Sequence, residues 1–304
     1  MKPRDIFIVG VGVVSPVGCD STALVQAFAG KKEKHLRELK CVGSNTYKCA
    51  SPPDFDVDKI ISASRLRRVS PISQFACAAA TLALRDAKLS LDDKAIMRRV
   101  GVVTAVAQGG MTVTRQFQTE LVRQGVRAVS PMLFPETVYN APSSHLAAVL
   151  GCDHVNYTIV GDAAAAFNAV AMACDLLESG GVDQCLVVGA EEADWVTADA
   201  YHRFNKKVVT GEGAGALLLA KGQSGYARVI EVDRGQPFHS RAERNALAAG
   251  ARDVVAAQLG EAFTAGAIWQ LIADALRVRQ ERKQVRSLCV GLNEQASTIT
   301  LGPV

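Results

Sequence analysis

Apolar segments of two kinds alternate along most of the chain. Residues 6–14 are rich in β-branched side chains and bounded by glycines, which predicts a buried strand followed by a turn. Residues 70–87 predict a long helix with Ser70 as its N-cap and a proline in its first turn. Residues 100–107 predict a second buried strand, and residues 112–123 an amphipathic helix.

Two later segments share one pattern. Each holds an apolar helix and two strands, predicted at residues 161–179, 185–189 and 214–220 in the first copy and at residues 267–277, 287–291 and 297–301 in the second. The strand at the start of the chain has a counterpart at residues 227–232. Such alternation is typical of an α/β protein with strands covered on both faces, and alanine-rich helices are expected between two sheets.

Composition removes several classes of protein. The 304 residues are 49% hydrophobic and 21% charged, which excludes disordered, collagen-like and coiled-coil chains. A net charge of +4 over this length gives no general attraction to nucleic acid. Every apolar run falls short of the roughly 20 residues that cross a bilayer, and the start lacks a signal-peptide pattern. We therefore expect a cytoplasmic protein without a membrane span.

Cysteine and histidine give little support for a metal site. The eight cysteines include no Cys-x-x-Cys pair, and most lie in apolar runs, so we expect reduced, buried thiols. The five histidines do not cluster with them. No metal and no cofactor is therefore predicted.

Several short motifs, most of them containing glycine, occur in a defined order. They are residues 9–18 (VGVGVVSPVG), 65–70 (RLRRVS), 99–103 (RVGVV), 187–191 (VVGAE) and 211–216 (GEGAGA). In this order they resemble the β-ketoacyl synthases, condensing enzymes of the thiolase fold. The resemblance implies a layered α-β-α-β-α fold in one unit, residues 1–304, with a first pseudo-repeat over about 1–222 and a shortened second one over about 223–304.

The resemblance also points to a missing nucleophile. The family carries a cysteine at the start of a buried helix, where the positive end of the helix and its free amides stabilise the thiolate and later the oxyanion. The matching segment, residues 158–166, places Ala163 at that position. Residues 161–166 are only Gly, Asp and Ala, so no alternative register supplies a thiol or hydroxyl.

Two family histidines are missing as well. One belongs to a Gly-His motif before an apolar helix, and the matching segment 260–266 carries Glu261 there. The other belongs to a His-Gly-Thr loop without counterpart here, and no histidine follows His239. The second half is shorter than in the family, which implies a deletion between about residues 240 and 255. All three catalytic positions are thus predicted to be lost.

Asp162 and Glu261 admit two interpretations. Each stands at a predicted helix start, where a carboxylate caps free backbone amides. Because the family fold brings these two helix starts toward one central pocket, the two carboxylates would alternatively share a proton and act as acid and base.

Other candidates concern partners. Arg65, Arg67 and Arg68 form either a solvated face or, by the resemblance, a docking site for the acidic acyl carrier protein. The family also places a helix near residues 111–120 beside the acyl tunnel at a dimer interface. Met111, Arg115 and Phe117 are therefore candidate tunnel residues, with ordinary helix packing as the alternative.

The resemblance implies one leading function. In aromatic polyketide and polyene systems, a catalytically silent homologue, the chain length factor, pairs with an active ketosynthase and shapes its acyl tunnel. We expect this chain to be such a non-catalytic subunit in bacterial type II polyketide or fatty-acid biosynthesis, although better-known chain length factors carry glutamine where this chain has Ala163. The alternatives are an enzyme using Asp162 and Glu261, and a homodimeric acyl-binding or scaffold protein. An inactivated cysteine enzyme is disfavoured because the histidines are absent too.

Overall fold

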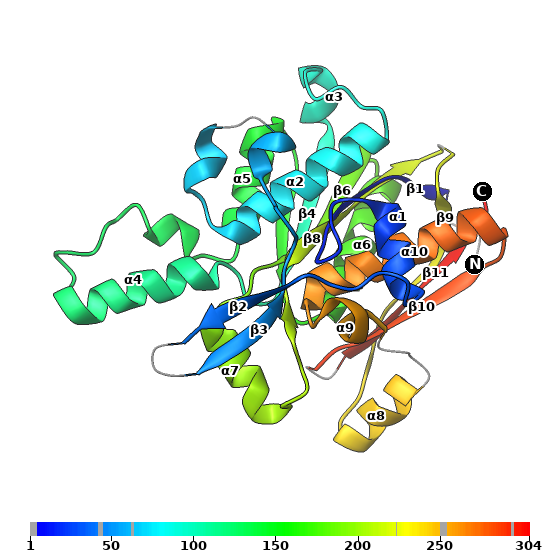
Figure 1. Cartoon of the computed structure of the whole chain (residues 1–304). Helices are drawn as coiled ribbons and strands as arrows, with labels where there is room; N and C mark the ends of the chain where they lie inside the picture. The colour runs from blue at the N-terminus through cyan, green and yellow to red at the C-terminus, as the bar shows by residue number, and fades with distance from the viewer. Residues whose placement is uncertain (1–4, 42–44, 62–63, 223, 250–253, 293–294) are drawn as a thin grey trace.

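The computed structural model describes residues 5–41, 45–61, 64–222, 224–249, 254–292 and 295–304 (Figure 1). Its strands are β1 (Ile6–Val14), β2 (Leu36–Lys40), β3 (Thr46–Ala50), β4 (Val100–Val106), β5 (Asn156–Val160), β6 (Gln184–Glu191), β7 (Thr210–Gly211), β8 (Gly213–Lys221), β9 (Ala227–Pro237), β10 (Val285–Val290) and β11 (Gln295–Gly302). Its α-helices are α1 (Ser21–Phe28), α2 (Pro71–Asp86), α3 (Lys94–Arg98), α4 (Met111–Gln124), α5 (Ala141–Leu150), α6 (Ala164–Glu178), α7 (Trp195–Phe204), α8 (Arg241–Ala249), α9 (Val254–Leu259) and α10 (Phe263–Glu281). The short 3-10 helices are η1 (Val57–Lys59), η2 (Ser64–Arg68) and η3 (Phe134–Glu136).

One curled sheet joins the two pseudo-repeats. The strand order is β10-β11-β9-β1-β8-β6-β4-β5, and β1 pairs with β9 through Phe7 opposite Arg228 and Ile8 opposite Ala227. The triplet β1-β8-β6 is antiparallel throughout, and so is its counterpart β9-β11-β10. The two expected sheets are therefore the two halves of a single sheet, because the first strands of the two repeats pair with each other.

Successive side chains of β8 point to opposite faces of the sheet, where they belong to two different hydrophobic cores. Leu217 and Leu219 belong to the core that contains α6 and α10, whereas Ala216 and Leu218 belong to the core that contains α2. Helix α6 packs on α10 and contacts β4 and β6 of the first half as well as β9 and β11 of the second. The alanine-rich helices thus lie inside the curl of the sheet, as the sequence predicts.

Glycines allow the helices to approach the strands closely. A Cβ on Gly10 or Gly12 of β1 would overlap the backbone of α2, and a Cβ on Gly189 or Gly215 would overlap α10. Helix α2 begins after Ser70 with proline at its first position, as predicted, although the Ser70 side chain makes no capping hydrogen bond. Its hydroxyl instead contacts Glu136 at 3.1 Å.

The second half is smaller and more open than the first. Between β1 and α6 the chain builds α2, β4, α4, α5 and β5, whereas the described chain between β9 and α10 holds only α8 and α9. Outward positions of this half include exposed Arg286 and Glu231, so coverage on both faces holds for the first half only. The predicted α/β fold with a shortened second pseudo-repeat is confirmed.

The state of the cysteines and the length of the helices were also predicted from the sequence. Six of the eight cysteines are buried, Cys41 is half-buried and Cys19 is exposed, and all are unbridged. In the portion of the chain that the structure describes, every helix is too short or too polar to span a bilayer.

Candidate functional site

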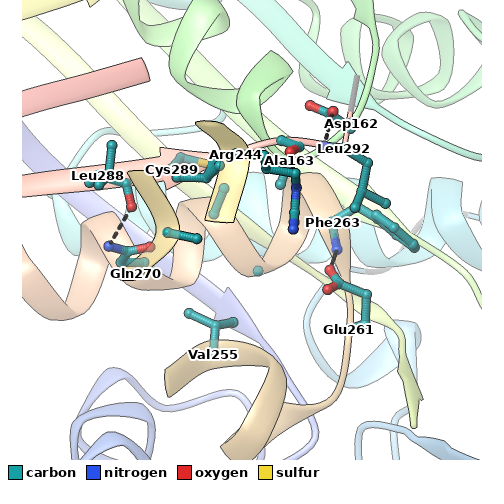
Figure 2. Close-up of a pocket in the computed structure, with 15 residues that line it drawn as sticks. Asp162, Ala163, Arg244, Val255, Glu261, Phe263, Gln270, Leu288, Cys289 and Leu292 are labelled. Atoms are coloured by element: carbon teal, nitrogen blue, oxygen red, sulfur yellow. Dashed lines mark hydrogen bonds between the residues drawn. The ribbon is translucent and has the colours of Figure 1, made fainter. Parts of the chain in front are cut away.

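The starts of α6 and α10 meet at a cavity of about 110 Å³ beside strand β10 (Figure 2). Helices α8 and α9 and the turn after β10 close its other sides. Its lining residues are Asp162, Ala163, Arg244, Ala248, Val255, Glu261, Phe263, Gly266, Ala267, Gln270, Leu288, Cys289, Val290, Gly291 and Leu292. The fold therefore brings together Asp162, Ala163 and Glu261, which the sequence placed at one pocket.

Asp162 holds two separate segments of backbone. Its Oδ1 accepts a hydrogen bond of 2.9 Å from the amide of Ala164, the first residue of α6. The carboxylate therefore satisfies a free amide as predicted, although the N-cap residue itself is Ala163. Its Oδ2 accepts a bond of 2.6 Å from the amide of Leu292. A Cβ on Gly291 would overlap this carboxylate, so only glycine lets the turn approach it.

Glu261 binds a backbone amide at the start of α10, as Asp162 does at the start of α6. Its Oε1 accepts a hydrogen bond of 3.0 Å from the amide of Phe263, two residues later, just as Asp162 bonds the amide two residues after itself. Phe263 has a φ of 40°, in the left-handed region. The centre of its ring lies 5.0 Å from the centre of the Tyr201 ring. Burial, followed by the charges of Glu261, Glu191 and Asp162, raises the pKa of the Tyr201 phenol.

Three lining residues with polar or thiol side chains were not predicted from sequence. Arg244 donates from Nε to the carbonyl of Gly291 at 2.9 Å, and Gln270 donates to the carbonyl of Leu288 at 3.5 Å. Cys289 lies on β10. Arg244 falls where the resemblance implies a deletion, so family motifs give no signal for it. Gln270 and Cys289 are single polar positions within apolar segments and carry no pattern of their own.

The lining offers limited chemistry. Among its described residues none is serine, threonine or histidine, and the single thiol, Cys289, lies on a strand and not at a helix start. Ala163 presents a methyl group at the N-terminus of α6. Most lining side chains are apolar, with Asp162, Glu261, Arg244 and Gln270 as the polar exceptions. A mainly apolar lining with a few polar groups is typical of a site that binds a small molecule.

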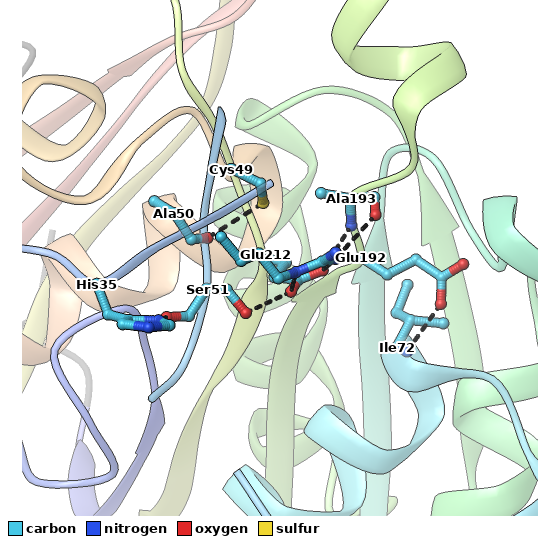
Figure 3. Close-up of polar contacts among 9 residues, drawn as sticks. His35, Cys49, Ala50, Ser51, Ile72, Glu192, Ala193 and Glu212 are labelled. Carbon is cyan, nitrogen blue, oxygen red and sulfur yellow. Dashed lines mark hydrogen bonds and ion pairs between the residues drawn. The ribbon is translucent and has the colours of Figure 1, made fainter. Parts of the chain in front are cut away.

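Buried carboxylates support the strands and loops around this site. Glu191 accepts hydrogen bonds from the amide of Ala107 at 2.7 Å and from the Thr264 hydroxyl at 2.6 Å. Glu192 accepts a hydrogen bond of 3.0 Å from the amide of Ile72 (Figure 3). It also accepts one of 2.6 Å from the amide of Thr112, and so joins the starts of α2 and α4. Burial raises the pKa of Glu191 and of Glu192 to about 7.

Two further acids are paired with arginines. Glu212 binds Arg37 at 2.7 Å, the Ser51 hydroxyl at 2.6 Å and the amide of Ala193, so it fixes the β2–β3 hairpin (Figure 3). Asp194 binds Arg115 of α4 at 2.8 Å. The concentration of acids directly after β6 was visible in the sequence, yet which backbone amides they hold depends on segments distant in the chain.

The candidate tunnel residues lie on α4, away from the cavity. Helix α4 has no buried residue and projects from the body of the protein (Figure 1). Arg115 is engaged by Asp194, and its guanidinium lies 6.0 Å from the ring centre of Trp195. Phe117 contacts Phe134 with ring centres 5.9 Å apart, and Met111 is half-buried. None of these three residues lines the cavity, so α4 forms a separate surface.

The candidate docking arginines lie on η2, next to the start of α2. Arg68 is exposed. The side chains of Arg65 and Arg67 lie outside the part of the chain whose side chains are described.

Comparison with known proteins agrees with this fold. The chain is 24% identical over 257 residues to the 3-oxoacyl-[acyl-carrier-protein] synthase 2 of Vibrio harveyi, an alignment that covers 76% of this chain and 61% of the relative, so the chain spans about three fifths of the curated relatives that it matches. Among solved structures, the ishigamide ketosynthase/chain length factor superposes with a TM-score of 0.80 at 17% identity, covering 98% of this chain and 99% of that one.

A second solved structure gives the same fold. The ketosynthase complex AntDE:AntF, described as a type II polyketide synthase acyl-carrier protein in complex with its ketosynthase bound to the hexaketide, superposes with a TM-score of 0.80 at 16% identity and covers 100% of both chains. The family model described as "Beta-ketoacyl synthase, N-terminal domain" matches residues 3–224. This match covers most of the chain, including α6 and the strands around it. The chain therefore belongs to the β-ketoacyl synthase family.

Proposed function

We propose that this protein is a non-catalytic ketosynthase-like subunit of the chain length factor type. In this role it pairs with an active β-ketoacyl synthase and shapes the acyl tunnel in bacterial type II polyketide or fatty-acid biosynthesis. The single observation that carries the proposal is the site itself. Ala163 is the N-cap of α6, the helix start at which the resemblance predicts the family nucleophile, and no described lining residue is a histidine. A fold kept without its catalytic groups is expected to act through shape and association.

A surface suited to association lies on one stretch of the chain. Among the described residues, eight of the thirteen exposed large hydrophobic side chains fall within residues 122–160. We call them the pairing surface: Val122, Val126, Met132, Phe134, Val138, Tyr139, Tyr157 and Val160. We propose that they gather on one face, since exposed apolar side chains that share a face mark a protein–protein interface. We assign an active ketosynthase as its occupant, because the ishigamide and AntDE:AntF structures are described as ketosynthase assemblies.

Strand β5 gives this surface an open edge. It is the last strand of the sheet beyond β4, and Tyr157 and Val160 on it are 49% and 51% exposed. An unpaired edge with apolar side chains favours pairing with another chain. Helix α4 and η3 lie against each other through Phe117 and Phe134. On this proposal, Met111, Arg115 and Phe117 would contribute to the partner-facing wall of the tunnel.

Further parts of the assembly follow from the same proposal. The acyl carrier protein would dock at the face that carries Arg65, Arg67 and Arg68, since a cationic patch complements an acidic partner. We further propose that the chain acts as one unit, with its first pseudo-repeat over about residues 1–222 and its second over about 223–304. Strand pairing between β1 and β9 supports such a unit.

Co-expression with the ketosynthase encoded beside it tests the proposal, with the mass of the complex measured by size-exclusion chromatography and light scattering. A 1:1 heterodimer is expected. The variant Tyr157→Glu/Val160→Glu should abolish it by placing charges in an apolar contact, whereas Phe204→Glu, at a 91% exposed position on α7 outside the pairing surface, should leave it intact. A monomer or a pure homodimer in the wild-type mixture would contradict the proposal, and the homodimer would favour the scaffold alternative.

A further inference from the structure

Two backbone amides from distant segments converge on one carboxylate in the lining of the cavity. The amide of Ala164, at the start of α6, donates to Asp162 at 2.9 Å. The amide of Leu292, in the turn after β10, donates to the same carboxylate at 2.6 Å (Figure 2). The two amides contact different oxygens of the carboxylate, Oδ1 and Oδ2. Asp162 therefore fills this amide pair with both of its oxygens.

Converging amides beside a helix N-terminus are a general receptor for anionic oxygen. The helix dipole and the fixed N–H groups favour a carboxylate or a developing oxyanion, and they need no rearrangement to bind it. In this chain the negative oxygens come from Asp162 itself. This arrangement requires glycine at position 291, because a Cβ there would overlap the Asp162 carboxylate.

The other polar groups of the cavity do not replace the occupied amides. Arg244 directs its Nε to the carbonyl of Gly291, and the Gln270 amide donates to the carbonyl of Leu288. Glu261 adds a second carboxylate to the lining. Ala248, Val255, Phe263, Leu288 and Val290 make the remaining surface apolar.

We infer that Asp162 is a built-in ligand that occupies the oxygen-binding position of this cavity. In the native chain these two amides are therefore closed to an added carboxylate or thioester oxyanion. Removal of the Asp162 carboxylate opens a position for a small carboxylate. The inference concerns the cavity alone and holds whichever protein occupies the pairing surface.

Chemical rescue with sodium acetate tests the inference directly. The Tm of purified wild type, Asp162→Ala and Asp162→Asn is measured with 100 mM sodium acetate and with sodium chloride at equal ionic strength. Acetate is expected to raise the Tm of Asp162→Ala by about 2–4 °C relative to chloride, because it binds the folded state only. Wild type and Asp162→Asn should show no difference, since a side chain still fills the position. Equal effects on all three proteins, or none on Asp162→Ala, would overturn the inference.

A second measurement stays informative if Asp162→Ala does not fold. Ala163→Cys places a thiol next to the carboxylate, and Asp162→Asn/Ala163→Cys places the same thiol beside a neutral group of the same shape. The helix N-terminus favours the thiolate, whereas Asp162 opposes it. Alkylation by iodoacetamide at pH 7, with the site identified by mass spectrometry, should be on the order of five- to tenfold faster in the double variant. Equal rates would mean that Asp162 does not control this position. Heterodimer formation is scored separately, so failure here leaves the proposed function untouched.

Discussion

Arg115 on the projecting helix α4 forms an ion pair of 2.8 Å with Asp194, which is 4% exposed and caps α7. Asp194 accepts from the Arg115 Nε with both oxygens. Since α4 buries no residue of its own, its orientation depends on such polar anchors, together with the bond from the amide of Thr112 to Glu192. The helix that presents part of the pairing surface is therefore fixed mainly by buried acids.

We predict that Arg115→Ala weakens this anchor. The substitution leaves the buried Asp194 carboxylate without its cation, which should lower the free energy of unfolding by about 1–3 kcal/mol. Hydrogen exchange should become faster in α4 while α2 is unchanged. Arg123→Ala, at an exposed position of the same helix, is the matched control. Unchanged exchange in α4 for Arg115→Ala would mean that the ion pair does not hold the helix.

Stability should fall as the pH rises through neutrality. Burial raises the pKa of Glu191 and Glu192 to about 7, above the ordinary value of 4.5, so the folded state binds protons that the unfolded state has released. The free energy of unfolding should therefore decrease between about pH 5 and pH 7.5, on the order of 2–3 kcal/mol for each carboxyl. Urea titrations at several pH values measure this slope.

The glutamine variants separate these two groups from the rest of the titration. Glu191→Gln and Glu192→Gln imitate the protonated carboxyl, so each should flatten the pH slope. Glu38→Gln, at an exposed position, should leave it unchanged. A slope that both buried variants retain in full would show that other groups cause it.

Gly291→Ala should disrupt the contact between Asp162 and the turn after β10. The added methyl group overlaps the Asp162 carboxylate, which must then release the amide of Leu292. We expect a loss of about 1–3 kcal/mol in the free energy of unfolding. Gly181→Ala is the control, because a Cβ there meets its nearest atom at an ordinary 3.5 Å. The double variant Asp162→Ala/Gly291→Ala should lose less than the sum of its single changes, and full additivity would contradict the overlap.

Ala163→Cys by itself should not restore condensation. The thiol would regain the helix start, but no described lining residue is a histidine that could drive decarboxylation. Incubation with malonyl and acyl carrier proteins, followed by mass spectrometry, should detect no 3-oxoacyl product. Product formation by this variant alone would refute our account of the second half.

The sequence predicted the fold because its signals are local. The apolar run of β1, the proline start of α2 and the repeated helix–strand–strand pattern that became α6-β6-β8 and α10-β10-β11 follow from hydrophobic periodicity and turn residues. The absence of a thiol at Ala163 also needs only the order of residues. The predicted proximity of Asp162 and Glu261, which came from the family resemblance, agrees with the cavity they share.

Tertiary structure decided the relationships between distant segments. The bond from Leu292 to Asp162 joins residues 130 positions apart, and nothing near either residue in the chain specifies it. The same holds for Arg244 in the cavity wall and for Glu192 between two helix starts. Pairing of β1 with β9 turned two expected sheets into one, because strand pairing depends on which edges meet in space. The residue types at the site were thus set by sequence, whereas the groups that each of them holds were set by long-range packing.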